Sequence, residues 1–440
     1  MWKRILLVST LTMLLVLVGC SNDKKDNGEG SVYYLNFKPE IADDIEALAK
    51  EYEEETGVKV KVVTAAQGTY ESTLTAEVAK SDPPTVFFIN GPVGYKNWAD
   101  YTLDLSDSKL YDWLLDKDMA ISNDDGVFGL PIAVEGYGII YNKAIFNQYF
   151  DSANKTTDVA SVEEINNFAT LQAVVEDMTA MKDELGIEGV FSSTSLAPGD
   201  DWRWQTHLAN IPVYYEYKDK EIVETDELEF TYEEQFANIF DLYLNNSVVA
   251  STLLGSKTTD DSMTEFALGQ SAMVQNGNWA WGQIANVDGN IVNEEDIGFL
   301  PIYTGVDGEE KQGIAIGTEN YLAFNSQADE KDLEASMKFV EWMFESDTGK
   351  EYAIEKFGFI PTFSTFGEDE VPTDPLAKAV IADMESDTYT IDWNFITFPS
   401  ETFKNEFGNA LLLYAQEQAS WEDVVDTVVE AWAREASLAQ

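Results

Sequence analysis

One carboxylate, Glu135, interrupts a run of β-branched and other apolar residues between Leu130 and Lys143. A Glu inside a buried strand costs several kcal/mol unless a partner offsets its charge, and the sequence indicates no buried partner for it. Gly136 and Gly138 follow, and glycines within a strand often mark a bend or a close approach by a ligand. The run fits either a strand that turns and exposes Glu135 to water, or a hinge whose carboxylate binds a ligand.

Tryptophans cluster at two other places in the chain. Trp202 and Trp204 flank Arg203, and this group either packs one helix face inward or presents aromatic and cationic side chains to a ligand. Trp279 and Trp281 open a predicted helix. Because residues two apart point away from each other on a helix, we expect one of these two tryptophans to face a cleft.

The N-terminal part alternates predicted strands and helices. Strands are expected at 32–37, 58–62 and 85–89, with helices at 41–52 and 70–80 between them. This order predicts an open α/β sheet whose ligands bind at the carboxyl ends of the strands. Polar or turn residues follow all three strands at that edge: Asn36, Lys38, Gln67, Gly68, Asn90 and Gly91.

A second series of strands and helices follows Lys143, and it ends in amphipathic helices expected near 329–345, 375–385, 401–417 and 420–436. We expect two lobes that the chain joins near 131–137, near 312–322 and again after Phe359. The predicted boundaries are an N-terminal lobe of 31–134 and 314–360 and a C-terminal lobe of 135–313 and 361–440.

Length and composition agree with this organisation. A chain of 440 residues is too long for one ordinary core and is expected to form two domains or more. The sequence is 45% hydrophobic and 12% aromatic, which argues against disorder. The formal charge of −53 argues against nucleic acid and anionic lipid surfaces as partners.

The N-terminus carries an export signal. Lys3 and Arg4 precede an apolar segment that is too short to span a membrane, so residues 1–19 are predicted to be a signal peptide. The segment ends Leu-Val-Gly-Cys, which resembles the bacterial lipoprotein cleavage box and implies a lipid on Cys20. Cys20 is the only cysteine, which excludes disulfides within the chain and thiolate metal sites. Residues 20–30 are polar and glycine-containing, as in a flexible tether.

Three further motifs carry a family resemblance. They are Glu55-Thr-Gly-Val-Lys-Val60, the run Pro131-Ile-Ala-Val-Glu135 with Ile140-Tyr-Asn-Lys143 behind it, and Ala272-Met273 followed by Asn276-Gly-Asn-Trp-Ala-Trp281. In this order and spacing the chain resembles the family 1 extracellular solute-binding proteins over essentially its whole mature length. The resemblance implies an α/β fold of the two-lobe periplasmic-binding-protein type II (Venus flytrap) with discontinuous lobes.

The resemblance also assigns roles. It implies that Glu135 binds sugar hydroxyls at the hinge and that Trp279 stacks on a pyranose ring. Maltose-binding members have an Asp-Arg pair after the third strand, where this chain has Asn90-Gly91-Pro92, so maltose itself is not the expected ligand. The complete expected ligand-binding set is Glu135, Trp279, Trp202, Arg203, Trp204, Asn36, Lys38, Gln67, Asn90, Gly91, Tyr137, Trp393 and Phe403.

The expected function is capture of a di- or oligosaccharide. Sugars present hydroxyls and apolar C–H faces, so amides and carboxylates beside aromatic rings suit them. The resemblance implies a monomer that delivers the sugar to the permease subunits of an ABC importer, without catalysis, metal or cofactor. The lipid on Cys20 would hold the protein at the outer face of the bacterial cell membrane.

Three alternatives stay open. A secreted glycoside hydrolase needs two carboxylates about 5–9.5 Å apart, and the pairs Asp43-Asp44, Asp124-Asp125 and Asp200-Asp201 lie in segments typical of solvated faces or turns. A polyamine or another small solute is compatible with the overall acidity, although few acids are predicted in the cleft. Calcium is a minor option, since Asp288-Gly-Asn290 lacks the later ligands of a calcium loop. The sole histidine, His207, is expected to be structural.

Overall fold

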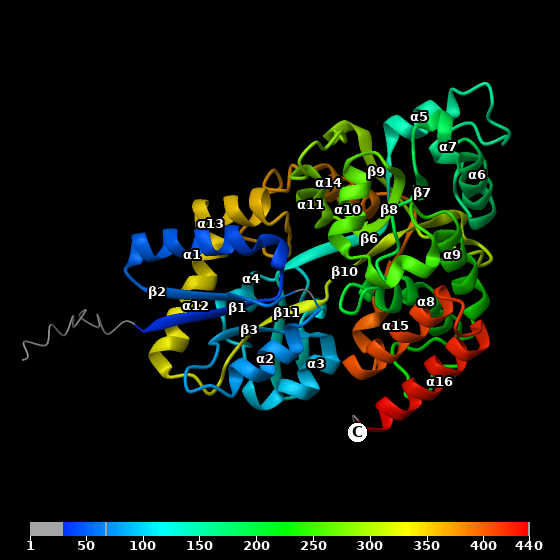
Figure 1. Ribbon diagram of the computed structural model, residues 1–440. Coiled ribbons are helices and arrows are strands. Elements are labelled where there is room, and N and C mark those ends of the chain that lie inside the picture. Colours follow the sequence, from blue (N-terminus) through cyan, green and yellow to red (C-terminus); the bar gives the residue numbers. More distant parts are fainter. Residues whose placement is uncertain (1–29, 67, 439–440) are drawn as a thin grey trace, which may run out of the picture.

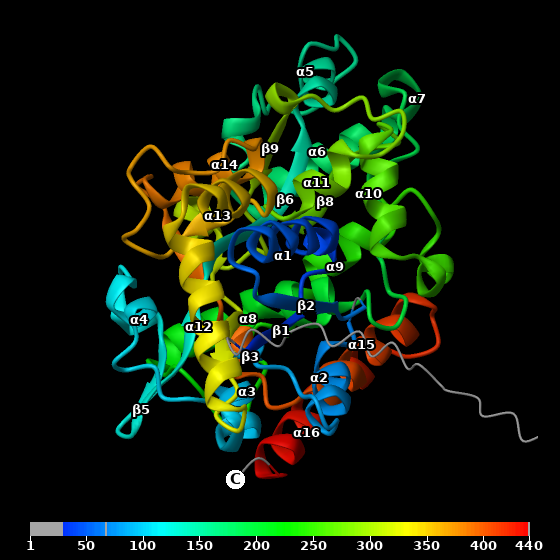
Figure 2. The same cartoon turned by 90° about the vertical axis from the view of Figure 1, so that its left-hand side faces the viewer.

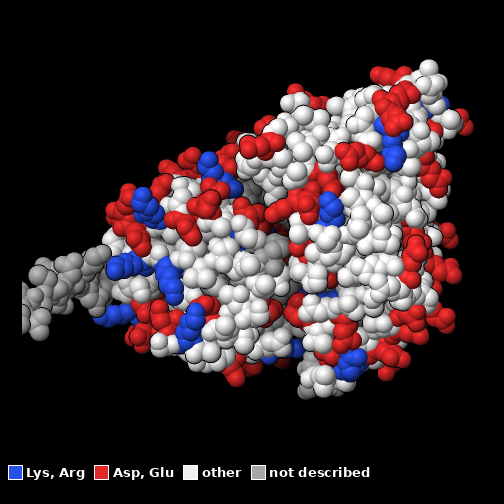
Figure 3. Space-filling view, in the orientation of Figure 1, with Lys and Arg blue, Asp and Glu red and all other residues white. Residues whose placement is uncertain are grey.

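The computed structural model describes residues 30–66 and 68–438. Within them, two β-sheets are each covered by helices and form two lobes that face each other across a hollow (Figures 1 and 3). The predicted two-lobe α/β architecture is therefore confirmed. The predicted signal peptide, Cys20 and most of the tether lie outside the described residues.

The first lobe is built on a six-stranded sheet with the order β2-β1-β3-β11-β5-β4. Strand β1 pairs in parallel with β2 and β3, as the strand–helix–strand order predicts, whereas β11 is antiparallel to β3 and β5. The elements of this lobe are β1 (Ser31–Asn36), α1 (Ala42–Thr56), β2 (Lys59–Thr64), α2 (Tyr70–Val78), β3 (Val86–Asn90), α3 (Gly91–Trp98), α4 (Lys109–Trp113), β4 (Ile121–Asn123), β5 (Gly126–Pro131), β11 (Asn320–Phe324), α12 (Glu330–Glu345) and α13 (Asp347–Glu351).

The second lobe is built on a seven-stranded sheet with β13-β10-β6-β8-β7 as its main path, and β9 and β12 also pair with β6. Its elements are β6 (Ala133–Asn142), α5 (Lys143–Phe150), α6 (Phe168–Ala180), α7 (Lys182–Leu185), β7 (Gly189–Phe191), the π-helix η5 (Arg203–Leu208), α8 (Ala209–Lys220), α9 (Glu233–Asn245), α10 (Thr259–Ala267), β8 (Ser271–Gly277), α11 (Ala280–Ala285), β9 (Ile297–Leu300), β10 (Gln312–Gly317), β12 (Ile360–Pro361), α14 (Pro375–Met384), β13 (Tyr389–Asp392), the short helix η10 (Asn394–Thr397), α15 (Glu401–Ala415) and α16 (Trp421–Leu438).

Alternating side chains of the first sheet explain its two helical layers. Tyr34 and Phe88 point to the face covered by α1 and α12, where they pack with Phe339. Leu35 and Phe87 point to the other face, which α2 and α3 cover. Figure 2 shows α1 above strands β1 and β2 and α12 beside them, with α2 and α3 below. Because successive side chains of a strand alternate between faces, nearly every residue of β1 and β3 is buried.

The chain passes between the two sheets three times. β5 ends at Pro131 in the first sheet, and β6 begins at Ala133 in the second. β10 ends at Gly317 in the second sheet, and β11 begins at Asn320 in the first. The third passage follows α13 and ends at α14, which packs on β6 and β9. The three predicted crossings agree with this strand pairing.

The exact lobe boundaries stay a prediction, and the backbone pairing near two of them is as follows. β10 pairs with β6 and β13, so residues 314–317 join the second sheet instead of the first lobe. After β12, Thr362 and Ser364 form backbone hydrogen bonds with Leu115 and Trp113 of the first lobe. Because β12 itself pairs with β6 of the second sheet, the chain contacts both lobes around the predicted boundary at residue 361.

The surface is acidic on both lobes (Figure 3). Asp and Glu are distributed over the visible face, and no single basic patch stands out there. Among the described residues, no helix is long and apolar enough to cross a membrane.

Thr362 offers a test of the contact between two crossings. Its hydroxyl donates to the carbonyl oxygen of Pro131 at 2.7 Å, and Thr362 is buried. Thr362→Val leaves that carbonyl without this donor, so we expect a loss of about 1–3 kcal/mol of unfolding free energy, measured by urea denaturation.

The matched control is Thr365→Val. The hydroxyl of Thr365 is buried and has no hydrogen-bond partner in the described part of the chain, so its replacement should leave the stability unchanged or slightly raise it. Equal effects of the two substitutions would contradict a role for the Thr362 bond.

Candidate functional site

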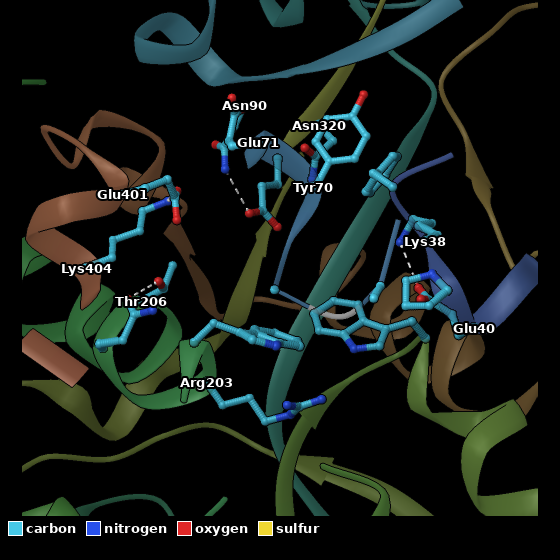
Figure 4. A pocket seen from close by; sticks show the side chains of 18 of the residues that line it. Lys38, Glu40, Tyr70, Glu71, Asn90, Arg203, Thr206, Asn320, Glu401 and Lys404 are labelled. Atoms are coloured by element: carbon cyan, nitrogen blue, oxygen red, sulfur yellow. Dashed lines mark hydrogen bonds and ion pairs between the residues drawn. The ribbon is translucent and has the colours of Figure 1, made fainter. Parts of the chain in front are cut away.

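A cavity of about 370 Å³ lies between the lobes. Its volume falls in the usual range for small-molecule sites, about 300–1,000 Å³. Residues of both lobes form its wall, and Figure 4 shows the side chains that converge on it. The wall consists of Phe37, Lys38, Pro39, Glu40, Ala66, Gly68, Tyr70, Glu71, Ser72, Asn90, Glu135, Trp202, Arg203, Gln205, Thr206, Trp279, Gln283, Glu319, Asn320, Glu401, Lys404 and Asn405.

Six residues of the predicted ligand-binding set line this cavity: Lys38, Asn90, Glu135, Trp202, Arg203 and Trp279. Lys38 and Asn90 follow or end strands of the first sheet, at the edge where the sequence places ligands. Glu135 lies near the start of β6, and Trp279 immediately precedes α11. The topology thus brings segments from both lobes to one cavity, although the role of each residue in binding stays a prediction.

An ion pair joins the lobes at the floor of the cavity. Lys38 Nζ lies 2.6 Å from Glu135 Oε1 and 3.3 Å from Glu40 Oε1, and Glu135 is only 9% exposed. Burial alone lowers the pKa of Lys38, but the carboxylates of Glu135 and Glu40 outweigh it and raise that pKa overall. Glu135 therefore has a buried partner, whereas the sequence indicated none. The partner, Lys38, lies 97 positions earlier in the chain, so no local pattern reveals it.

Two tryptophans form the aromatic part of the wall. The ring centroids of Trp202 and Trp279 are 6.1 Å apart with an interplanar angle of 39°. Lys38 Nζ lies 5.7 Å from the Trp279 centroid, which brings the ion pair next to the aromatic rings. Trp281, by contrast, packs against a hydrophobic cluster of the second lobe that includes Ile284. The expectation that one tryptophan of this pair faces a cleft is confirmed for Trp279.

His207 supports these rings from below. Its imidazole stacks on Tyr137 at 4.3 Å and meets the edge of Trp202 at 4.7 Å. Burial and the nearby cations Arg203 and Lys404 hold the pKa of His207 well below its usual range, so the ring is neutral at pH 7. His207 packs behind the cavity wall and does not line it, and its structural role stays a prediction.

Arg203 lies behind Trp202. Its guanidinium carbon is 3.9 Å from the Trp202 ring centroid, and Nη1 donates to the hydroxyl of Thr259. Trp202 and Arg203 lie at the start of the π-helix η5. Gln205 and Thr206 of the same helix also line the cavity. π-helical turns are rare in proteins, and those that occur are often found at functional sites.

Six predicted residues lie outside the cavity wall. Trp204 packs in the core of the second lobe and donates to the carbonyl oxygen of Ser195. Phe403 packs against Trp432 in the same core. Tyr137 and Trp393 form the layer beneath Trp279 with His207. The other two are Asn36, which is buried and hydrogen-bonded to the backbone of Lys38, and Gly91, which contacts Ile396.

Gln67, the remaining member of the set, lies outside the described residues, and its neighbour Gly68 lines the cavity. Most of the wall residues that were not predicted from the sequence are polar. They include Glu40, Glu71, Glu319 and Glu401, so the expectation of few acids in the cleft is wrong. Glu401 and Lys404 are three residues apart on a predicted helix, which is the usual pattern of a solvent-exposed face. They line the cavity because this face of the helix packs toward the other lobe.

Burial perturbs two of these carboxyl groups. It raises the pKa of Glu319 to about 7, an effect that Lys404 reduces and Glu135 increases. Burial also raises the pKa of Glu71, against the hydrogen bond that its carboxylate accepts from Trp98. In residues 30–66 and 68–438, no three His, Cys, Asp or Glu side chains lie close enough together to hold a metal ion.

Comparison with known proteins identifies the family. The profile described as "Bacterial extracellular solute-binding protein" matches residues 47–379. No curated protein sequence matches the chain.

Similar solved structures include a "Chitin oligosaccharide binding protein" (TM-score 0.67, 18% identical, covering 93% of this chain and 100% of that chain). They also include RafE in complex with raffinose (TM-score 0.69, 17% identical, covering 92% and 99%). A third is a sugar transporter from Bacillus licheniformis in complex with stachyose (TM-score 0.67, 15% identical, covering 92% and 100%). At these identities the likeness shows the fold.

Gly91 tests a close contact between the two lobes. Its φ is +60°, and a Cβ built there would lie 2.8 Å from Cβ of Ile396 in the other lobe. Overpacking costs about 1–3 kcal/mol, so Gly91→Ala should hold the lobes apart. We expect a larger radius of gyration by small-angle X-ray scattering.

Gly186→Ala is the matched control, since Gly186 has φ +72° but no atom within 4 Å of its would-be Cβ. It carries the same backbone strain without an interlobe contact, and its scattering should equal that of the wild type. If the two variants scatter alike, the Gly91 contact does not set the lobe separation.

Proposed function

The chain belongs to the family of bacterial extracellular solute-binding proteins, and we propose that it captures a di- or oligosaccharide between its lobes for delivery to an ABC importer. Proteins of this family bind solutes and do not transform them, so the chain is a binding protein and not an enzyme. The observation that carries the proposal is the tryptophan pair beside a charged hydrogen-bonding pair in one interlobe cavity.

The chemistry of this cavity suits a sugar. Trp202 and Trp279 offer apolar faces for the C–H side of a pyranose ring, whereas Glu135, Asn90 and Gln283 offer polar groups for its hydroxyls. Solved structures of similar fold are described as binding chitin oligosaccharide, raffinose and stachyose. These descriptions support a carbohydrate ligand for this chain as well.

Three crossings between the lobes are compatible with closure of the lobes on a ligand. Hinges are commonly a few residues at the ends of elements, and the first two crossings here consist of Ile132 and of Thr318 and Glu319. Glu135 and Glu319 both lie near these crossings and both line the cavity. A sugar that binds Glu135 would therefore contact a group close to the axis of motion.

We further propose that a lipid on Cys20 anchors the protein at the outer face of the cell membrane, with residues 20–30 as a tether. The support is the sequence alone: a charged start, an apolar segment and the Leu-Val-Gly-Cys box. Two or more acyl chains give stable anchoring. The first strand, β1, begins at Ser31, directly after this segment.

Trp279→Ala tests the sugar site. The wild type is first screened by thermal shift against neutral and charged mono- to oligosaccharides, and the ligand with the largest shift is titrated by calorimetry. Truncation of an aromatic anchor costs about 2 kcal/mol or more, so we expect its Kd to rise about thirtyfold.

Trp281→Ala is the control, because Trp281 is two residues away and packs in a hydrophobic cluster of the second lobe. Its Kd should stay within threefold of the wild type. A sugar that binds Trp279→Ala as well as wild type would remove Trp279 from the site, and a failure of all sugars to bind would refute the proposed function.

Cys20→Ala tests the anchor. We expect the wild-type protein in the membrane fraction of the expressing bacterium and the variant in the soluble fraction or the medium, as judged by immunoblot. Ser21→Ala, one position further on, leaves the lipidation cysteine in place and should remain with the membrane. Membrane retention of the Cys20 variant would contradict a thioether-linked lipid.

A further inference from the structure

The cavity wall has more carboxylates than cations. Five carboxylates line it and three cations accompany them: Glu40, Glu71, Glu135, Glu319 and Glu401, with Lys38, Arg203 and Lys404. Figure 4 shows Lys38 and Glu40 on one side of the cavity and Glu401 and Lys404 on the opposite side, with Glu71 and Asn90 above. A neutral sugar needs hydrogen-bonding groups, but it does not need this excess of negative charge.

Three of the five carboxylates already have cations. Lys38 pairs with Glu135 and Glu40, and Lys404 Nζ lies 2.8 Å from Glu401 Oε1. These pairs balance most of the charge on both sides of the cavity.

Glu71 and Glu319 form no ion pair within the described residues, although the nearby cation Lys404, which pairs with Glu401, acts to lower the pKa of both carboxyl groups. Each accepts a hydrogen bond from an uncharged donor, Glu71 from Trp98 Nε1 at 3.1 Å and Glu319 from Asn90 Nδ2 at 3.2 Å. Burial makes the ionised form of both carboxyl groups costly, and it raises the pKa of both. A cation bound beside them would reverse that cost. The site is not one for a metal, since too few potential ligands converge anywhere in residues 30–66 and 68–438.

The same cavity also has unused donors. Arg203 is 2% exposed, and neither its Nε nor Nε1 of Trp202 has a hydrogen-bond partner in the described structure. Such buried groups without partners are uncommon in native proteins, and both belong to residues that line the cavity. The ligand then meets Trp202 and Trp279 in the same cavity as the two unpaired carboxylates.

Glu71 lines two neighbouring cavities, and Glu319 is hydrogen-bonded to Asn90, which also lines both. Glu71 and Asn90 also line an adjoining cavity of about 230 Å³ between α3 and the start of α15. Since Asn90 holds Glu319 by a hydrogen bond, both unpaired carboxylates belong to the junction of the two cavities. A ligand that extends from the tryptophans toward the adjoining cavity passes this junction.

We propose that the ligand is an amine-bearing carbohydrate, whose ammonium group binds at Glu71 and Glu319 while a sugar ring contacts Trp202 and Trp279. This inference rests on the proposed function and names the substrate class of the same site. An ammonium group supplies the missing charge and up to three hydrogen-bond donors. An N-acetylated or hydroxylated sugar of the same length supplies no charge and leaves both carboxylates unpaired.

Calorimetric titration of the full chain with matched β-1,4-linked trisaccharides tests the proposal at pH 7 and physiological salt. The probes are the trimers of glucosamine, N-acetylglucosamine and glucose, with spermidine as an amine that carries no sugar ring. We expect the glucosamine trimer to bind about tenfold more tightly than the other two trimers, because hydrogen bonds to charged groups are the strong ones.

The variants Glu71→Gln and Glu319→Gln keep an acceptor for Trp98 or Asn90 but remove the charge. In each of them we expect the ratio between glucosamine-trimer and glucose-trimer affinity to fall severalfold. Glu54→Gln is the control, since Glu54 is on the outer face of α1 with a side chain 70% exposed. It removes one charge from the same acidic protein and should keep the wild-type ratio, because distant charges are screened in salt.

Each other outcome overturns the inference. If the glucosamine trimer binds no more tightly than the glucose trimer, the amine preference is refuted while the carbohydrate function stands. Binding of spermidine without any trisaccharide refutes both the inference and the carbohydrate function. A preference that survives in both Gln variants, or that falls equally in Glu54→Gln, refutes the assignment to Glu71 and Glu319. Failure of all four probes to bind refutes the amine class, and the broader sugar screen then decides the proposed function separately.

Discussion

The ion pair between Lys38 and Glu135 is the interaction on which the cleft depends. Each partner comes from a different lobe, and neither could be buried alone without a penalty of several kcal/mol. Their contact is therefore strongest when the lobes are together. Asn278 fixes the position of Glu135, because it accepts a hydrogen bond from the Gly136 N–H and donates its own N–H to the Gly136 carbonyl oxygen. The floor of the cavity is thus held by both the charge pair and the backbone of β6.

Above this floor, the aromatic wall is built in two layers. Trp202 and Trp279 line the cavity, while His207, Tyr137 and Trp393 lie behind them. Rings that pack against other rings lose rotational freedom before a ligand arrives, which lowers the cost of binding. Burial and the cations Arg203 and Lys404 lower the pKa of His207, which favours a neutral imidazole in this layer.

Sequence reasoning located the parts of the site that depend on short motifs. The strand–helix order of residues 32–89, the hinge carboxylate Glu135 and the cleft-facing Trp279 follow from local periodicity and from the family motifs. It failed where the outcome depends on the other lobe. Helical spacing marks the face of α2 or α15 that packs inward, but it cannot tell whether the polar face with Glu71 or Glu401 meets water or the opposite lobe. Likewise, the π-helical turn after Trp202 sends Trp204 into the core, which a regular helical period does not reveal.

The placement of β11 has a consequence for how the protein acquires its fold. β11 lies between β3 and β5 in the first sheet, yet it follows the whole segment from β6 to β10 in the chain. Until residues 320–324 have been synthesised, the strands of this sheet remain two separate groups with exposed, unpaired edges. Contacts of such long sequence separation form slowly. The order of the strands therefore delays completion of the first sheet until about three quarters of the chain has been synthesised.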